Sequence, residues 1–89
     1  MAGSDSILMV YITAANAGDA RSIGQMLVRE RLAACTNIFD SVTSIYWWND
    51  TVQNDGETVL IAKTTVARFG LLKKRVAALH SYDCPCIVA

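Results

Sequence analysis

The sequence predicts an α+β fold built as one small domain. The chain has 89 residues, which is enough for one hydrophobic core but not for two. Apolar residues recur every second position in some segments and every three to four positions in others, as in strands and helices respectively. These segments follow one another as strand, helix, strand, strand, helix, strand. We expect residues 1–5 to form a flexible tail and residues 6–89 to form the domain.

The first strand and helix are expected within residues 6–32. The stretch SILMVYIT, residues 6–13, is short, apolar and β-branched, which predicts a buried strand with apolar side chains on both faces. Asn16 is a favourable N-cap for the helix that follows. Gly24 lies on the apolar stripe of this helix, where it would let the helix approach a sheet closely. That stripe comprises Ala20, Ile23, Gly24, Leu27, Val28 and Leu32.

From Cys35 onward the apolar period falls to two, which predicts two long strands joined by a hairpin. Two turn signals, at residues 49–50 and 54–56, leave the point of reversal open. Thr65 can cap a second helix, in which residues 73–75 form a solvated basic edge. The sequence CIVA at the end of the chain predicts a last strand. The inward stripe of the second helix comprises Phe69, Leu72, Val76 and Leu79.

Right-handed crossovers turn this order of elements into a four-stranded antiparallel sheet with both helices on one face. This is the ferredoxin-like split βαβ arrangement, βαββαβ. Two helices can cover only one face of the sheet, yet the first strand and the hairpin carry apolar side chains on both faces. A monomer would therefore expose a large apolar patch, so we expect the chain to form a homo-oligomer.

Composition and the lack of motifs argue against several classes of function. Eight basic and eight acidic residues cancel, which gives no electrostatic reason to bind nucleic acid or an anionic membrane. No apolar run reaches the roughly 18 residues of a membrane span. An odd count of three cysteines without a secretion signal predicts reduced thiols and a cytoplasmic location. Neither a phosphate-binding glycine motif nor a recognisable catalytic set is present, so we expect no enzymatic activity.

The only histidine and two of the three cysteines cluster in the stretch HSYDCPCIVA. Cys84 and Cys86 would share a face of an extended strand, and Pro85 favours that conformation. Together with His80 they offer thiolate and imidazole ligands, which suit copper or zinc. The set supplies at most three ligands and matches no standard zinc spacing, so buried thiols beside a capping histidine are the alternative. Cys35 is expected in the core.

Three consecutive aromatic residues, 46–48, have two interpretations. They could form a packed interface, or they could form the wall of a ligand pocket. Glu57 and Lys63 lie six residues apart on one face of the same predicted strand, which is too far for a direct ion pair within that strand. Each is expected to reach a neighbouring strand or subunit, or to remain solvated.

These residues together resemble the CutA divalent-cation tolerance proteins. The likeness runs from about Ile7 to Val88 and includes RLAACxNI, SxYWW, ETVLIAKTT and FxxLxxxVxxLHxYxxP in this order. The resemblance implies a ferredoxin-like subunit in a homotrimer, with hairpin strands that pair across subunits. It also implies a non-enzymatic role in tolerance of copper and other divalent cations. Relatives continue beyond the position of Ala89, so the domain is expected to be short at its C-terminus relative to the family.

The resemblance also bears on the candidate sites. It implies that His80 is the best candidate for a metal ligand, while Cys84 and Cys86 could supply thiols in place of ligands that the family pattern has and this chain lacks. The family's own pattern is incomplete, because Ile12 stands where some members have a cysteine and Ser81 stands where a proline is usual. The trimeric PII signalling proteins have a similar architecture, so the alternative is a signalling, small-molecule-binding or protein-anchoring module. The inter-subunit pocket of such a module would be lined by Trp48, Glu57, Lys63 and Tyr82.

Overall fold

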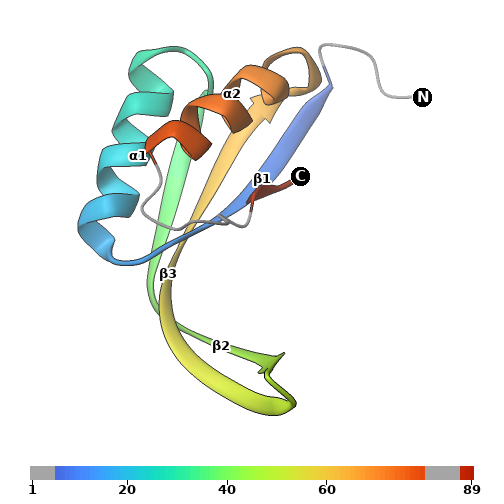
Figure 1. Ribbon diagram of the computed structural model, residues 1–89. Helices are drawn as coiled ribbons and strands as arrows, with labels where there is room; N and C mark the ends of the chain where they lie inside the picture. Colours follow the sequence, from blue (N-terminus) through green and yellow to red (C-terminus); the bar gives the residue numbers. More distant parts are fainter. Residues whose placement is uncertain (1–5, 80–86) are drawn as a thin grey trace.

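A computed structural model describes residues 6–79 and 87–89, which form two helices and one sheet (Figure 1). Neither of these helices is long and apolar enough to cross a membrane. The elements in chain order are β1 (Ile7–Ala14), α1 (Ala17–Arg29), β2 (Cys35–Trp48), β3 (Thr51–Thr65), α2 (Val66–Leu79) and β4 (Ile87–Val88).

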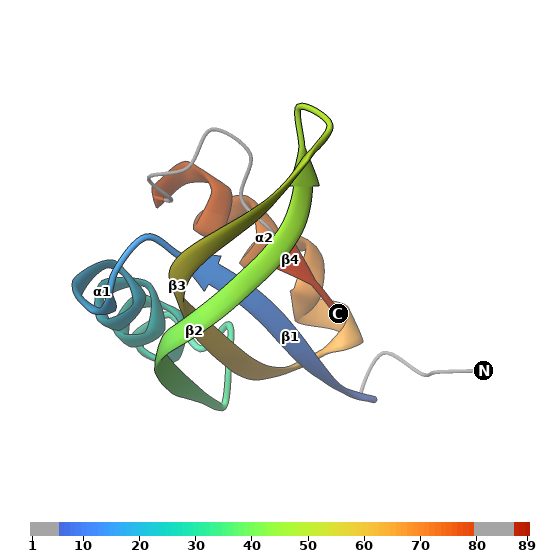
Figure 2. The same cartoon turned by 90° about the horizontal axis from the view of Figure 1, so that it is seen from below.

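The four strands lie in the order β2-β3-β1-β4, and every neighbouring pair is antiparallel. The two central strands are therefore the ones that each precede a helix, as expected for a split βαβ arrangement. Seen from below, the strands lie in front of both helices, so the helices cover one face of the sheet (Figure 2). The predicted α+β architecture is confirmed.

The core lies between the helices and the covered face of the sheet. Strand β1 shows the alternation that produces it, because Val10 and Ile12 are fully buried whereas Ile7 and Met9 are exposed on the opposite, open face. Two residues predicted for the inward stripes, Val28 and Leu79, are about half exposed instead. Both lie in the last turns of their helices. The buried cluster comprises Val10, Ile12, Ile23, Leu27, Leu32, Ala33, Leu60, Ala62, Leu72 and Val76.

Local signals in α1 have the predicted effects. The Asn16 side chain caps the helix by accepting a hydrogen bond of 2.8 Å from the backbone N–H of Asp19. Gly24 is buried against the sheet, and a Cβ at this position would lie 2.9 Å from Oγ1 of Thr36 and 3.4 Å from Cδ1 of Leu60. The close approach inferred from the sequence is therefore confirmed.

The hairpin reverses at Asn49 and Asp50, whose φ angles of 51° and 59° match the two-residue turns that suit the strand twist. The other turn signal, residues 54–56, lies inside β3. The register shifts by one residue between Phe39 and Val42, which marks a β-bulge. Because of this shift, the odd-numbered residues of β2 before the bulge and the even-numbered residues after it face the same side. Beyond the bulge the hairpin extends away from the helices (Figure 1).

The open face and the hairpin expose many large apolar side chains, as the pattern of strands predicted. Trp47 is 73% exposed and Trp48 65% exposed, on opposite faces of the hairpin. A single chain thus presents far more apolar surface than scattered surface residues would give. The exposed set on β1, β2 and β3 comprises Ile7, Met9, Tyr11, Ile38, Phe39, Ile45, Tyr46, Trp47, Trp48 and Val52.

Candidate functional site

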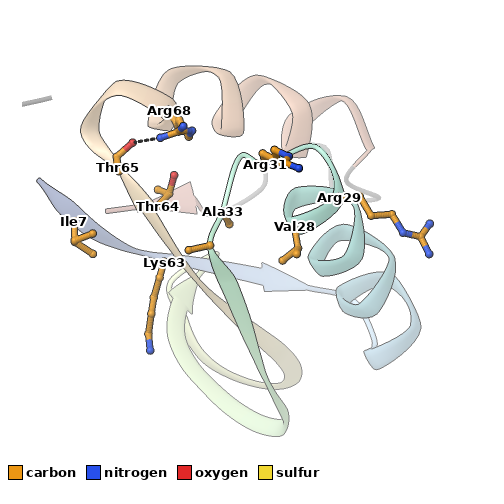
Figure 3. Close-up of a pocket in the computed structure, with 10 residues that line it drawn as sticks. Ile7, Val28, Arg29, Arg31, Ala33, Lys63, Thr64, Thr65 and Arg68 are labelled. Atoms are coloured by element: carbon orange, nitrogen blue, oxygen red, sulfur yellow. Dashed lines mark hydrogen bonds between the residues drawn. The ribbon is translucent and has the colours of Figure 1, made fainter. Parts of the chain in front are cut away.

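A cavity of about 590 Å³ lies where the end of α1, the start of β2, the end of β3 and the start of α2 meet (Figure 3). Its size is in the range typical of small-molecule sites. Four of the lining residues are apolar, and the other six carry cationic or hydroxyl groups. The lining residues are Ile7, Val28, Arg29, Arg31, Ala33, Ala34, Lys63, Thr64, Thr65 and Arg68.

The loop between α1 and β2 brings Arg31 to this cavity. Helix α1 ends in a Schellman motif, in which the N–H of Arg31 donates to the carbonyl of Val28 and the N–H of Leu32 donates to that of Leu27. This motif places Arg31 in the left-handed region, with φ of 60°. Glycine is the usual residue at this position, because a side chain makes the left-handed conformation unfavourable.

Two hydrogen bonds from β3 fix the loop. The buried hydroxyl of Thr64 donates to the carbonyl of Leu32 at 2.5 Å. The backbone N–H of Ala34 donates to the carbonyl of Lys63 at 2.8 Å. The backbone that follows Arg31 is therefore tied to β3 at Leu32 and Ala34.

The cavity is strongly cationic. Four of its ten lining residues are basic and none is acidic. In the described part of the chain, Arg29, Arg31 and Lys63 make no side-chain hydrogen bond or ion pair, whereas Arg68 donates to Oγ1 of Thr65 at 3.3 Å. The first turn of α2 also faces this region and adds the positive end of a helix dipole.

The nearest carboxylate in sequence, Glu30, is engaged elsewhere. It forms a two-pronged ion pair with Arg75 of α2, with N···O distances of 2.9 and 2.7 Å. The hydrogen bond from Arg75, supported by its charge, lowers the pKa of the Glu30 carboxyl group. The pair joins the end of α1 to α2, so Glu30 does not neutralise the cations of the cavity.

The predicted inter-subunit pocket has three described members, and a single chain does not bring them together. Trp48 lies at the tip of the hairpin, opposite Thr51, while Lys63 lies near the other end of β3. Glu57 accepts a hydrogen bond of 2.6 Å from the Ser44 hydroxyl on β2. It thus reaches a neighbouring strand, as predicted. Tyr82 lies outside the described residues.

The predicted metal ligands His80, Cys84 and Cys86 also lie outside the described residues. Among residues 6–79 and 87–89, no three His, Cys, Asp or Glu side chains are grouped so that they could hold a metal ion. Cys35 was expected in the core, and this expectation is wrong. It is half-buried on the open face, where it pairs with Lys63, because the core lies on the other side of the sheet.

The sequence interpretation missed Arg29, Arg31 and Arg68 as members of a common site. The predicted helix end near Leu32 was a partial signal, since residues after a helix often carry an irregular backbone. The sequence pattern does not indicate that β3 and the start of α2, more than 30 residues further along the chain, lie next to the loop that contains Arg31.

This chain forms an antiparallel ferredoxin-like domain with two helices on one face of the sheet and a long projecting hairpin, and these features define its structural class. Comparisons with known proteins then give its family. The family described as CutA1 divalent ion tolerance protein matches residues 8–89. The chain therefore belongs to the CutA divalent-cation tolerance family.

The relatives agree in sequence and in structure. The divalent-cation tolerance protein CutA of Thermus thermophilus is 51% identical over 81 residues, which are 91% of this chain and 79% of that protein. The solved structure of the Thermus thermophilus protein matches with a TM-score of 0.88 at 48% identity, over 93% of this chain and 81% of that one. CutA1 of Oryza sativa matches with a TM-score of 0.90 at 35% identity, over 96% and 78%.

The match to this chain covers different shares of the relatives' own lengths. The chloroplastic CutA 1 protein of Oryza sativa is 38% identical over 92% of this chain, but the match spans only 46% of that protein. The chain thus spans about four-fifths of the bacterial relative and less than half of this plant relative.

Proposed function

We propose that this protein is a non-enzymatic homotrimer that binds copper or another divalent metal ion and takes part in the response to such ions. The observation that carries the proposal is family membership. A bacterial relative with 51% identity bears the name divalent-cation tolerance protein, and the match extends over nearly all of this chain.

The proposed metal ligands are His80, Cys84 and Cys86. Thiolate and imidazole are the donor types that copper and zinc prefer. They are also the donors that this chain concentrates within seven residues. A neutral imidazole is required for ligation, so metal affinity should fall below about pH 6.

The exposed apolar surface supports the trimer. The open face and the outer hairpin have no covering element in the described part of the chain, and both are rich in aromatic and aliphatic residues. Burial of such surface is the usual driving force for association. The pairing of hairpin strands between copies would cover both faces of the hairpin at once.

We further propose a cytoplasmic location, because an odd number of cysteines suits a reducing compartment. The PII-like alternative remains a prediction. It needs a second copy of the chain to bring Trp48 and Lys63 into one pocket, so it depends on the same oligomer.

Native mass spectrometry of the purified protein, with and without one equivalent of Cu(II) per chain, tests the proposal. We expect a trimer that gains about three copper ions. His80→Ala and the double variant Cys84→Ser/Cys86→Ser should lose this copper. Cys35→Ser is the matched control, since it removes a thiol that lies elsewhere, and it should bind copper as the parent protein does.

Two results would contradict the proposal. A monomer in the native mass spectrum would contradict the proposed trimer. Copper binding that survives in His80→Ala, or that is lost equally in Cys35→Ser, would show that these three residues are not the site.

A further inference from the structure

The cationic cavity is the strongest feature of the described structure that metal tolerance does not use. Three of its four basic side chains have no partner within the described residues, and no carboxylate lies in its lining. Like charges that lie near one another repel, and a bound anion would relieve that repulsion. The feature therefore points to an anionic ligand.

The backbone at Arg31 supports the same conclusion. Its left-handed φ of 60° is a conformation that glycine adopts without strain and that an arginine does not. Strained residues of this kind occur preferentially at functional sites. Figure 3 draws Arg31 on the loop after α1, Arg68 on α2 and Thr64 on β3, and all three line the same cavity.

The two arginines are suited to a phosphate group. A guanidinium presents several N–H donors in one plane, which match phosphate oxygens, and it keeps its charge at any physiological pH. The start of α2 adds its dipole, which favours an anion at this end. Lys63 and Arg29 contribute charge from the rim, and the side chain of Arg29 extends away from the cavity (Figure 3).

The remainder of the cavity is suited to an apolar group. Ile7, Val28 and Ala33 are apolar residues of the lining, in addition to the charged ones. A volume of about 590 Å³ exceeds what a phosphate ion alone needs. We propose that this cavity binds a small phosphate ester, with Arg31 and Arg68 on the phosphate and the apolar residues against the organic part. This proposal is independent of the metal site.

Phenyl phosphate is a suitable probe, because it combines a phosphate group with a small apolar ring. Its affinity can be measured by isothermal titration calorimetry on the full chain at constant ionic strength, with phenol as the uncharged control ligand. We expect Arg31→Gly and Arg68→Gln each to weaken binding about ten-fold, as expected for the loss of one charge-assisted contact.

Lys74→Gln is the matched control variant. It also removes one positive charge from α2, but Lys74 is exposed and does not line the cavity. It should change the affinity less than about two-fold, in keeping with the small effect of a distant screened charge. Arg31→Gly should keep or raise the unfolding temperature, which shows that its loss of binding is not a loss of folding.

Three outcomes would overturn the proposal. The first is that the parent protein does not bind phenyl phosphate. The second is that phenol binds as tightly as phenyl phosphate. The third is that Lys74→Gln loses as much affinity as Arg31→Gly. The last result would mean that the overall charge, rather than the cavity, attracts the anion.

Discussion

Replacement of Gly24 by alanine tests how closely α1 packs on the sheet. In an exposed helix this change stabilises by about 1 kcal/mol. Here the new Cβ would lie 2.9 Å from Oγ1 of Thr36 and 3.4 Å from Leu60. Overpacking of a core costs about 1–3 kcal/mol. The contact with Thr36 is hard to relieve, because a β-branched side chain is stiff. We therefore expect a net destabilisation of about 1 kcal/mol.

Gly70→Ala is the matched control for this prediction. Gly70 lies in α2, and a Cβ there would meet no atom within 4 Å, so alanine should stabilise by about 1 kcal/mol. Thermal unfolding at one fixed protein concentration measures both changes, since association makes stability depend on concentration. For a domain of this size, 1 kcal/mol corresponds to a shift of about 4–8 °C.

The double variant Gly24→Ala/Thr36→Ala identifies the atom responsible. Without Oγ1 of Thr36, the Gly24→Ala change should no longer destabilise, which a double-mutant cycle measures as coupling between the two positions. If Gly24→Ala stabilised the parent protein as much as Gly70→Ala does, the close contact between α1 and β2 would be wrong.

Three further changes probe the region around the cavity. Arg31→Gly should stabilise the protein by about 0.5–1 kcal/mol. Glycine removes the cost of about 1–2 kcal/mol of a left-handed arginine, but it also raises the entropy of the unfolded chain, which offsets part of this gain. An unfolding temperature below that of the parent would contradict this prediction. Thr64→Val should destabilise by about 1–2 kcal/mol in urea unfolding, since it removes the buried hydrogen bond to Leu32, and an unchanged midpoint would show that the bond contributes nothing. Glu30→Gln should lower the unfolding temperature at pH 7, because the hydrogen bond from Arg75 lowers the pKa of Glu30 in the folded protein. The stabilisation is present above the unfolded pKa of about 4.3 and is lost as the pH falls through the lower folded value; a difference between the two proteins that does not shrink as the pH falls would refute the role of the charge.

The fold could be predicted because its signals are local and mutually consistent. The period of apolar residues separates β1 from α1, Asn16 begins the helix, and a buried glycine marks the contact with the sheet. The point of hairpin reversal could not be predicted, because both turn signals have suitable residues. In the structure the chain reverses at Asn49 and Asp50, and residues 54–56 pair with β2.

The candidate site was harder to predict because its parts are distant in sequence. Arg31 belongs to the end of α1, Thr64 to β3 and Arg68 to α2, and only the ferredoxin-like topology brings them together. The sequence also gives no sign that Arg31 adopts a left-handed backbone, since glycine is the residue from which such a conformation is usually inferred. By contrast, the cluster of one histidine and two cysteines could be identified from the sequence, because its members lie within seven residues of the chain.

The residues of the two proposed sites are separate in sequence, and this allows separate tests. Arg68 is in the first turn of the helix and Leu79 is its last residue, a distance of about 16 Å along the axis at 1.5 Å per residue. The proposed metal ligands begin at the next position in sequence, His80. Because the two proposals use different residues, Arg68→Gln should leave copper binding unchanged and His80→Ala should leave phenyl phosphate binding unchanged. If either variant changed both affinities, the binding of the two ligands would be thermodynamically linked.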